Sequence, residues 1–264
     1  MSKITKNIEI DGKNLFEDKV FRVMAGPCAV ESRDQILYTA DKLSKLGIEI
    51  FRAGTFKPRV DPETYQGARE QGLSWLDEAR KDFGVKIITE TTDLTNFDLV
   101  EKYSDIIQIG AKAMYNPALL TKAGKSEKPV LLKRHFGATV DEYLKMLKYI
   151  TKEGNQNVIL CERGIRTFET ASRFTLDLCG AAAIQEKCDF PLVIDPSHSM
   201  GHSYGVAKLA RAAVAFGGSG LLVEVHHDPK NALCDSEQAL SIEEFAELYK
   251  EMQEIGKAMG ITVK

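Results

Sequence analysis

Eight short runs rich in Val, Ile and Leu recur along the 264-residue chain, and a segment with helical spacing follows each one. The runs cover residues 21–28, 48–54, 85–90, 105–110, 129–134, 157–164, 191–198 and 220–227. Short aliphatic runs of this kind predict strands buried on both faces, as in a parallel sheet. Eight strand–helix units predict a (β/α)8 TIM barrel, because eight parallel strands close such a barrel. A doubly wound open sheet also alternates, but nothing in the sequence marks a second domain.

The segments between the runs carry apolar residues on one helical face. Phe245, Leu248, Tyr249 and Met252 show this spacing near the end of the chain. We therefore predict an α/β fold with a single barrel domain at residues 20–264 and a short N-terminal extension at residues 1–19.

Composition excludes several classes of partner. The formal net charge is −3, which favours neither nucleic acid nor an anionic membrane surface. No apolar run approaches the ~18 residues that cross a bilayer, and the polar N-terminus carries no secretory signal. The five cysteines contain no CxxC pair, which favours reduced thiols and a cytoplasmic protein.

Four potential metal ligands stand at the carboxyl ends of the predicted strands, where barrels of this type place their chemistry. Cys28 ends the first run and His198 the seventh, while Glu224 lies late in the eighth run and Asp235 beyond it. One thiol, one imidazole and two carboxylates suit Mn, Fe, Co or Zn better than Mg or Ca. The pattern predicts one divalent metal ion.

Cationic residues form a second group at the same strand ends. Its members are Arg52, Lys57, Arg59, Lys112, Lys133 and Arg163, with Arg166 as a further candidate and Glu162 beside Arg163. Cations gathered at one cavity repel one another unless anions neutralise them, and Arg and Lys bind phosphate and carboxylate groups. A metal ion beside such a pocket indicates a small phosphorylated substrate with a polarised carbonyl.

Each residue also has a structural interpretation when it is considered alone. Cys28 is then a small buried residue, and Asp235 is a residue that begins a helix. A Lys or Arg at the end of a strand is then a solvated surface charge. Glu224 is the exception, because an acid in a buried strand is costly unless it is paired or bound to metal. The shared position of these residues at one set of strand ends favours a functional site. Cys161, Cys179 and Cys188 are predicted to be packing residues, and the role of Cys234 stays open.

Eight motifs run in order along nearly the whole chain. They are AGPCAVES (25–32), FRAGTFKPR (51–59), ITETTD (88–93), QIGA (108–111), KPVLLKR (128–134), ILCERGIRTFE (159–169), VIDPSHSMG (193–201) and LLVEVHHDPKNALCD (221–235). Together they resemble the 3-deoxy-D-arabino-heptulosonate 7-phosphate (DAHP) synthases. The short microbial type, which is related to 3-deoxy-D-manno-octulosonate 8-phosphate synthase, is the most similar.

The resemblance implies a transferase that condenses phosphoenolpyruvate with erythrose 4-phosphate to give DAHP and phosphate. This is the first step of the shikimate pathway of aromatic amino acid biosynthesis. The resemblance assigns the metal to Cys28, His198, Glu224 and Asp235, and phosphoenolpyruvate to Arg52, Lys133 and Arg163, with Glu162 and Lys112 as further substrate-binding residues. Lys57, Pro58 and Arg59 would meet the aldose phosphate, and the expected catalytic residues are Lys57, Cys28 and His198. The Lys-Pro-Arg sequence favours the four-carbon aldose, because octulosonate synthases typically carry Lys-Ala-Asn-Arg there.

The chain departs from the family pattern around the substrates. Lys112 and Ala113 replace an Arg-Asn pair, and Val60 stands where a Thr is common. His135 and Phe136 replace Gly-Leu, and the loop with Met200 and His202 often carries Thr and Arg. Two alternatives therefore stay open: a diverged paralogue that uses another aldose phosphate such as arabinose 5-phosphate, and a non-catalytic barrel that binds a phosphorylated ligand.

Assembly and regulation are expected from the resemblance alone. Relatives are commonly dimers or tetramers, so we expect a homodimer or homotetramer. No ferredoxin-like or chorismate mutase extension is visible, and we therefore expect no inhibition by Phe or Tyr through a separate domain.

Overall fold

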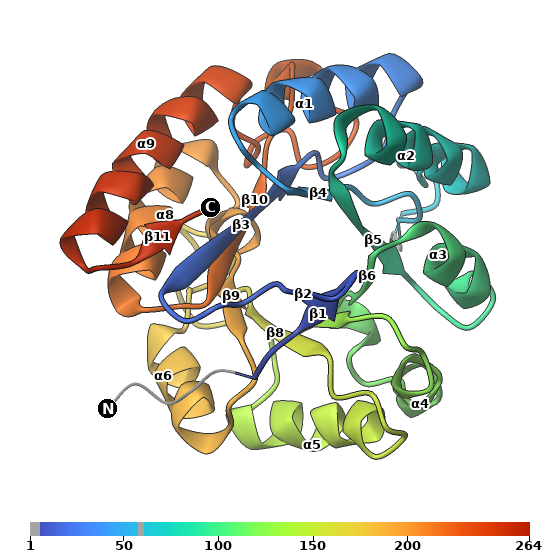
Figure 1. Ribbon diagram of the computed structural model, residues 1–264, viewed down its shortest axis with the longest axis vertical. Helices are drawn as coiled ribbons and strands as arrows, with labels where there is room; N and C mark the ends of the chain where they lie inside the picture. Colours follow the sequence, from blue (N-terminus) through green and yellow to red (C-terminus); the bar gives the residue numbers. More distant parts are fainter. Residues whose placement is uncertain (1–5, 58–60) are drawn as a thin grey trace.

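Eight parallel strands close into a barrel in the computed structural model, which describes residues 6–57 and 61–264 (Figure 1). The strands are β3 (Val20–Gly26), β4 (Ile50–Arg52), β5 (Lys86–Thr91), β6 (Ile106–Ile109), β7 (Val130–Lys133), β8 (Val158–Glu162), β9 (Leu192–Ile194) and β10 (Gly220–Glu224). The barrel closes where β10 pairs with β3, with Gly220 opposite Arg22 and Glu224 opposite Gly26. The predicted (β/α)8 fold is confirmed.

Helices surround the barrel on its outside (Figure 1). They are α1 (Arg33–Lys45), α2 (Arg69–Phe83), α3 (Phe97–Tyr103), α4 (Pro117–Gly124), α5 (Val140–Thr151), α6 (Leu178–Lys187), α8 (Ser203–Phe216) and α9 (Ile242–Ala258). The short helix α7 (Pro196–Met200) follows β9, and the loops hold two 3-10 turns, η1 (Ala111–Ala113) and η2 (Pro229–Asn231). Helix α9 begins at a capping box in which Ser241 and Glu244 bond to each other's backbone N–H. Its buried face holds Phe245, Leu248 and Met252, as the spacing predicts.

The strands are shorter than the aliphatic runs, and this changes the positions of two candidate ligands. Cys28 lies beyond β3, which ends at Gly26. His198 lies in α7 and not at the end of a strand, because β9 ends at Ile194. Pro196 begins the helix, and the Asp195 side chain caps it by accepting a hydrogen bond from the His198 backbone N–H. The predicted run extended too far because it included residues 195–198, in which no residue is aliphatic and Pro196 is typical of a helix start.

An N-terminal hairpin covers the amino ends of the barrel strands. Strands β1 (Glu9–Ile10) and β2 (Lys13–Asn14) pair antiparallel, and in Figure 1 they cross the opening of the barrel. Apolar residues in and beside the hairpin, Ile8, Ile10, Leu15 and Phe16, pack on the inner layer of the barrel. This layer consists of Met24, Ile50, Ile88, Ile106, Leu131, Ile159, Cys161, Val193 and Leu222. A last short strand, β11 (Thr262–Val263), pairs with the beginning of β3.

Replacing Phe16 with alanine is expected to lower the free energy of unfolding by about 3–5 kcal/mol, the range found for buried Phe. Phe16 is 3% exposed, follows the hairpin and packs on the inner layer of the barrel. Urea denaturation measures the change. Leu94→Ala is the control, because Leu94 is 44% exposed and its loss should change stability by less than about 0.5 kcal/mol. Equal stability of the two variants would show that the hairpin contributes nothing to the core.

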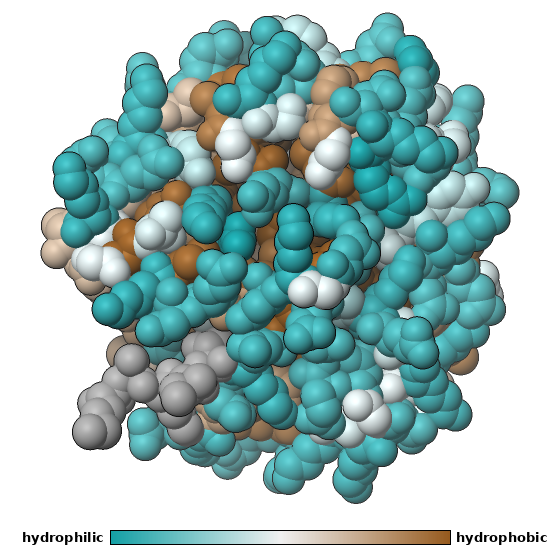
Figure 2. Space-filling view, viewed as in Figure 1, coloured by the Kyte–Doolittle hydropathy of each residue, from teal (hydrophilic) through white to brown (hydrophobic). Residues whose placement is uncertain are grey.

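The face that carries the hairpin is mainly hydrophilic, with apolar side chains visible in the gaps between the outer elements (Figure 2). In the described part of the chain, no helix combines the length and the apolar character that a membrane crossing requires.

Candidate metal centre and anion pocket

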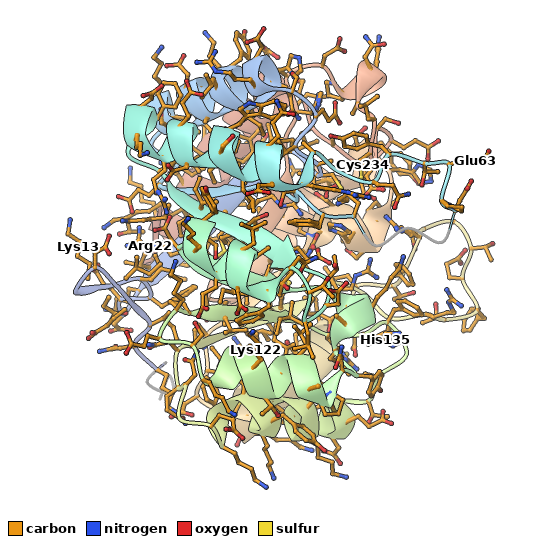
Figure 3. The ribbon with its side chains drawn as sticks, turned by 90° about the vertical axis from the view of Figure 1, so that its right-hand side faces the viewer. Lys13, Arg22, Glu63, Lys122, His135 and Cys234 are labelled. Carbon is orange, nitrogen blue, oxygen red and sulfur yellow. The ribbon has the colours of Figure 1, made fainter. Side chains whose placement is uncertain are left out.

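The candidate site lies at the carboxyl ends of the strands, at the opposite end of the barrel from the hairpin. Figure 3 shows Cys234 and His135 at this end and Lys13 at the other. Residues two apart in a strand point to the same face. Arg52, Lys133 and Glu224 each stand two residues after a member of the inner layer, so their side chains point into the barrel.

The four candidate metal ligands converge from four separate segments. Cys28 follows β3, His198 lies in α7, Glu224 ends β10, and Asp235 lies between η2 and α9. One donor atom from each lies within 4.8 Å of the other three, and all four residues are buried or partly buried. A thiol, an imidazole and two carboxylates at this separation fit one divalent transition-metal ion.

Asp195 orients His198. Its Oδ2 lies 2.8 Å from His198 Nδ1 and accepts a hydrogen bond of 2.7 Å from Lys133 Nζ. This contact directs Nε2 toward the other ligands, 3.4 Å from Glu224 Oε1. Burial lowers the pKa of His198, which favours the neutral ring near pH 7, the form that binds metal, and leaves the ring charged only in more acidic solution. Burial opposes ionisation of Asp195, but the charges of His198 and Lys133 hold its pKa well below its usual value.

Glu224 is held by two donors. Arg52 NH1 donates to Oε1 at 3.0 Å, and Gln238 Nε2 donates to Oε2 at 2.6 Å. Burial acts to raise the pKa of Glu224, but the charges of His198 and Arg52 outweigh it and the pKa is lowered. Glu224 is therefore a buried carboxylate whose charge is compensated, as a ligand residue requires.

Cys28 is in contact with three polar groups. Its Sγ lies 2.9 Å from Lys57 Nζ, 3.0 Å from Asp235 Oδ2 and 2.8 Å from Cys234 Sγ. In this environment burial raises the pKa of the Cys28 thiol well above its usual value. A bound cation together with the ammonium group of Lys57 would favour the thiolate that coordinates metal.

Two buried arginines have donors without a partner in the described residues. These atoms are Arg52 Nε and Arg163 NH1. The Arg163 guanidinium is 5% exposed and stacks on the Phe174 ring, 4.1 Å from its centroid. Burial lowers the pKa of Arg163, so the cation is destabilised where it lies. Unpaired buried donors next to the metal candidates fit an anionic ligand that is bound there.

The remaining candidates are placed differently. Glu162 follows Leu160 on the face of β8 that packs toward the helices, and it accepts a hydrogen bond of 2.8 Å from Arg134. Arg134 also donates to Asp177, so this placement favours a structural role for Glu162. Lys112 is exposed in η1. Pro58 and Arg59, together with Val60, lie outside the described residues.

A family model described as the DAHP synthetase I family matches residues 7–260. The chain belongs to this family. A phospho-2-dehydro-3-deoxyheptonate aldolase of Thermotoga maritima is 46% identical over 243 residues, which cover 92% of this chain and 72% of the relative. A 2-dehydro-3-deoxyphosphooctonate aldolase of Syntrophotalea carbinolica is 32% identical over 251 residues, which cover 88% and 90% of the two chains.

Solved structures of the DAHP synthetase I family agree with this assignment. The crystal structure of the Thermotoga maritima enzyme has a TM-score of 0.95 at 43% identity and covers 99% of this chain and 76% of that chain. A truncated form of 3-deoxy-D-arabino-heptulosonate 7-phosphate synthase from Thermotoga maritima has a TM-score of 0.91 at 41% identity, with coverage of 99% and 95%. The family resemblance inferred from the eight motifs is confirmed.

Three residues near the candidate centre were missed or left open by the sequence analysis. Asp195 contacts His198 and Lys133, Gln238 contacts Glu224, and Cys234 contacts Cys28. Only Asp195 left a signal in the sequence, because an acid before a proline is typical of a helix N-cap and Asp195 directly follows a buried strand. Gln238 and Cys234 lie in a loop whose path depends on tertiary packing.

Proposed function

We propose that this protein condenses phosphoenolpyruvate with erythrose 4-phosphate, forming DAHP and phosphate, and that it requires one divalent metal ion. The observation that carries the proposal is the convergence of Cys28, His198, Glu224 and Asp235 beside two buried guanidinium groups. A metal centre next to an anion pocket suits a reaction between a phosphorylated enol and an aldehyde. The 46% identical relative carries the name of this activity.

We assign a role in this reaction to each charged group in the pocket. We assign the phosphate and carboxylate groups of phosphoenolpyruvate to Arg52 and Lys133, whose side chains point into the barrel, and to Arg163, which has a buried donor without a partner in the described residues. When bound, the metal ion supplies Lewis acidity that polarises the aldehyde carbonyl. The enol carbon then attacks the aldehyde, water adds at the phosphate-bearing carbon, and phosphate leaves. Lys57 lies 2.9 Å from Cys28 Sγ, and we assign to it the proton that the new hydroxyl group takes up.

The aldose is tested by phosphate release from phosphoenolpyruvate in the presence of metal and one aldose phosphate at a time. We expect the highest kcat/KM with erythrose 4-phosphate and a lower value with arabinose 5-phosphate. A preference for arabinose 5-phosphate would favour the diverged paralogue, for which the departures at Lys112 and Val60 provide the reason. Absence of turnover with every aldose, in protein that holds metal, would favour the non-catalytic barrel.

Gln238→Ala is expected to weaken metal binding by about 10–100-fold, the usual effect of removing a partner that orients a metal ligand. Gln238 donates a 2.6 Å hydrogen bond to Glu224, and its loss leaves one carboxylate oxygen without that donor. Calorimetric titration of metal-free protein with Mn²⁺ measures the affinity. Gln156→Ala is the control, because Gln156 is bonded only at the protein surface. Equal affinities of the two variants would contradict the assigned role of Glu224.

We place this activity in the cytoplasm, at the entry to the shikimate pathway, in a homodimer or homotetramer. The five cysteines are free thiols, as in proteins of a reducing compartment. Light scattering after size-exclusion chromatography determines the subunit number.

A further inference from the structure

Asp235 differs from the other candidate ligands in the backbone that carries it. His198 lies in α7 and Glu224 in β10, but residues 232–239 form neither helix nor strand. Asp235 has a φ of 53°, in the left-handed region that residues with a side chain seldom adopt. Such a conformation costs free energy and persists only where the surrounding contacts fix it. The contacts on either side of Asp235 therefore decide where its carboxylate lies.

Glu31 holds the chain two residues before Asp235. Its Oε1 accepts a hydrogen bond of 2.8 Å from the Leu233 N–H, and its Oε2 lies 3.4 Å from His226 Nε2. Because His226 Nδ1 accepts a hydrogen bond from the Asp228 N–H, the neutral ring carries its proton on Nε2, the nitrogen that faces Glu31. The Glu31 side chain is 10% exposed. One largely buried carboxylate thus joins the chain beyond β10 to the segment before Asp235.

Arg173 holds the chain on the other side of Asp235. Its NH1 donates a hydrogen bond of 3.0 Å to Gln238 Oε1 and lies 3.8 Å from Asp235 Oδ1. The Arg173 N–H donates to the Met200 carbonyl at 3.0 Å, which fixes Arg173 on the end of α7. Gly201 permits this approach, because a Cβ atom there would lie 2.6 Å from the Cβ atom of Arg173. The guanidinium therefore reaches Asp235 from a fixed position.

We propose that Glu31 and Arg173 are positioning residues that hold Asp235 in the left-handed conformation from which its carboxylate reaches the metal ion. Neither belongs to the four converging ligands. Glu31 directly precedes α1, and Arg173 lies between β8 and α6, so two separate loops hold the segment between η2 and α9. Loss of either contact leaves the segment free to relax toward an ordinary backbone conformation, and the carboxylate then moves away from the other ligands. The proposal rests on the proposed metal centre.

Titration of the metal-free full chain with Mn²⁺ tests the proposal. We expect Glu31→Ala and Arg173→Met each to weaken Mn²⁺ binding by about 10–100-fold, as partners of metal ligands usually do. The visible absorption spectrum of bound Co²⁺ should change in both variants, because it depends on the ligands and their geometry. Two conservative variants should bind Mn²⁺ more tightly than these. Glu31→Gln keeps an oxygen that accepts from the Leu233 N–H, and Arg173→Lys keeps a donor for Gln238.

The same substitutions in an Asp235→Ala background separate positioning from general support of the fold. If Glu31 and Arg173 act through Asp235, neither substitution should weaken Mn²⁺ binding further once the carboxylate is absent. A residue that only supports the fold would weaken binding by the same factor in both backgrounds. Urea denaturation of each variant shows that the folded protein is the one titrated.

Glu78→Ala and Arg211→Met are the matched controls, because both residues form ion pairs at the protein surface. They should bind Mn²⁺ as the unchanged protein does. Unchanged affinity in Glu31→Ala or in Arg173→Met, where Asp235→Ala itself weakens binding, would overturn the proposal. Equal weakening in the two backgrounds would also overturn it. If Asp235→Ala binds Mn²⁺ as the unchanged protein does, the proposed metal centre is wrong and the positioning role falls with it.

Discussion

His198→Ala is expected to lower the rate of phosphate release by about 10³-fold or more, because a bound metal ion contributes several kcal/mol to catalysis and 1.36 kcal/mol corresponds to a factor of ten. The substitution removes the one imidazole of the four converging ligands. It also leaves Asp195 paired with Lys133 alone. Turnover with phosphoenolpyruvate and erythrose 4-phosphate, together with the metal content of the purified variant, measures the effect.

His227→Ala is the matched control for this substitution. His227 is exposed and stacks at the edge of the Tyr38 ring, away from the four ligands. The His227→Ala variant should bind one metal ion and release phosphate at the rate of the unchanged protein. A His198→Ala variant that retains both its metal and its activity would remove His198 from the proposed centre.

Arg163→Met is expected to have opposite effects on stability and on activity. The Arg163 cation is buried on Phe174 and has one donor without a partner in the described residues. Methionine keeps the apolar stem over the Phe174 ring but removes the buried charge. The free energy of unfolding should therefore rise by about 1–2 kcal/mol, as at other functional sites where stability is lower than the fold allows. The KM for phosphoenolpyruvate should rise by about 30-fold or more, because losing a buried charged contact costs about 2–5 kcal/mol and 1.36 kcal/mol corresponds to a factor of ten.

Steady-state kinetics and urea denaturation measure the two effects separately. Arg166→Met is the control, because Arg166 is exposed and stacks on Phe136 at 4.7 Å. It should change both quantities much less. A destabilised Arg163→Met protein with an unchanged KM would show that Arg163 supports the fold and does not bind substrate.

The sequence predicted the barrel because the signal is repeated eight times and does not depend on any single residue. It also predicted that the four candidate metal ligands converge, since strand ends in a closed parallel barrel meet at one mouth. Glu224 was the most informative residue, because a buried acid requires a partner.

The positions of some side chains could not be predicted from the sequence and are known only from the structure. Glu162 and Arg163 are neighbours in the sequence, yet the first pairs with Arg134 on the helix side and the second lies on Phe174. An aliphatic run that is buried on both faces does not reveal which residues point inward. The contact between Cys28 and Cys234 likewise depends on how the loop after β10 returns to the barrel mouth.

A metal titration of chelator-treated protein tests whether turnover depends on one metal ion bound at Cys28, His198, Glu224 and Asp235. Phosphate release from phosphoenolpyruvate and erythrose 4-phosphate is measured against the amount of Mn²⁺ bound per chain, in the unchanged protein and in Cys28→Ala. We predict no turnover without metal, a linear rise that ends at one ion per chain, and no rise in Cys28→Ala. Full turnover in metal-free protein, or an unchanged titration in Cys28→Ala, would contradict this prediction.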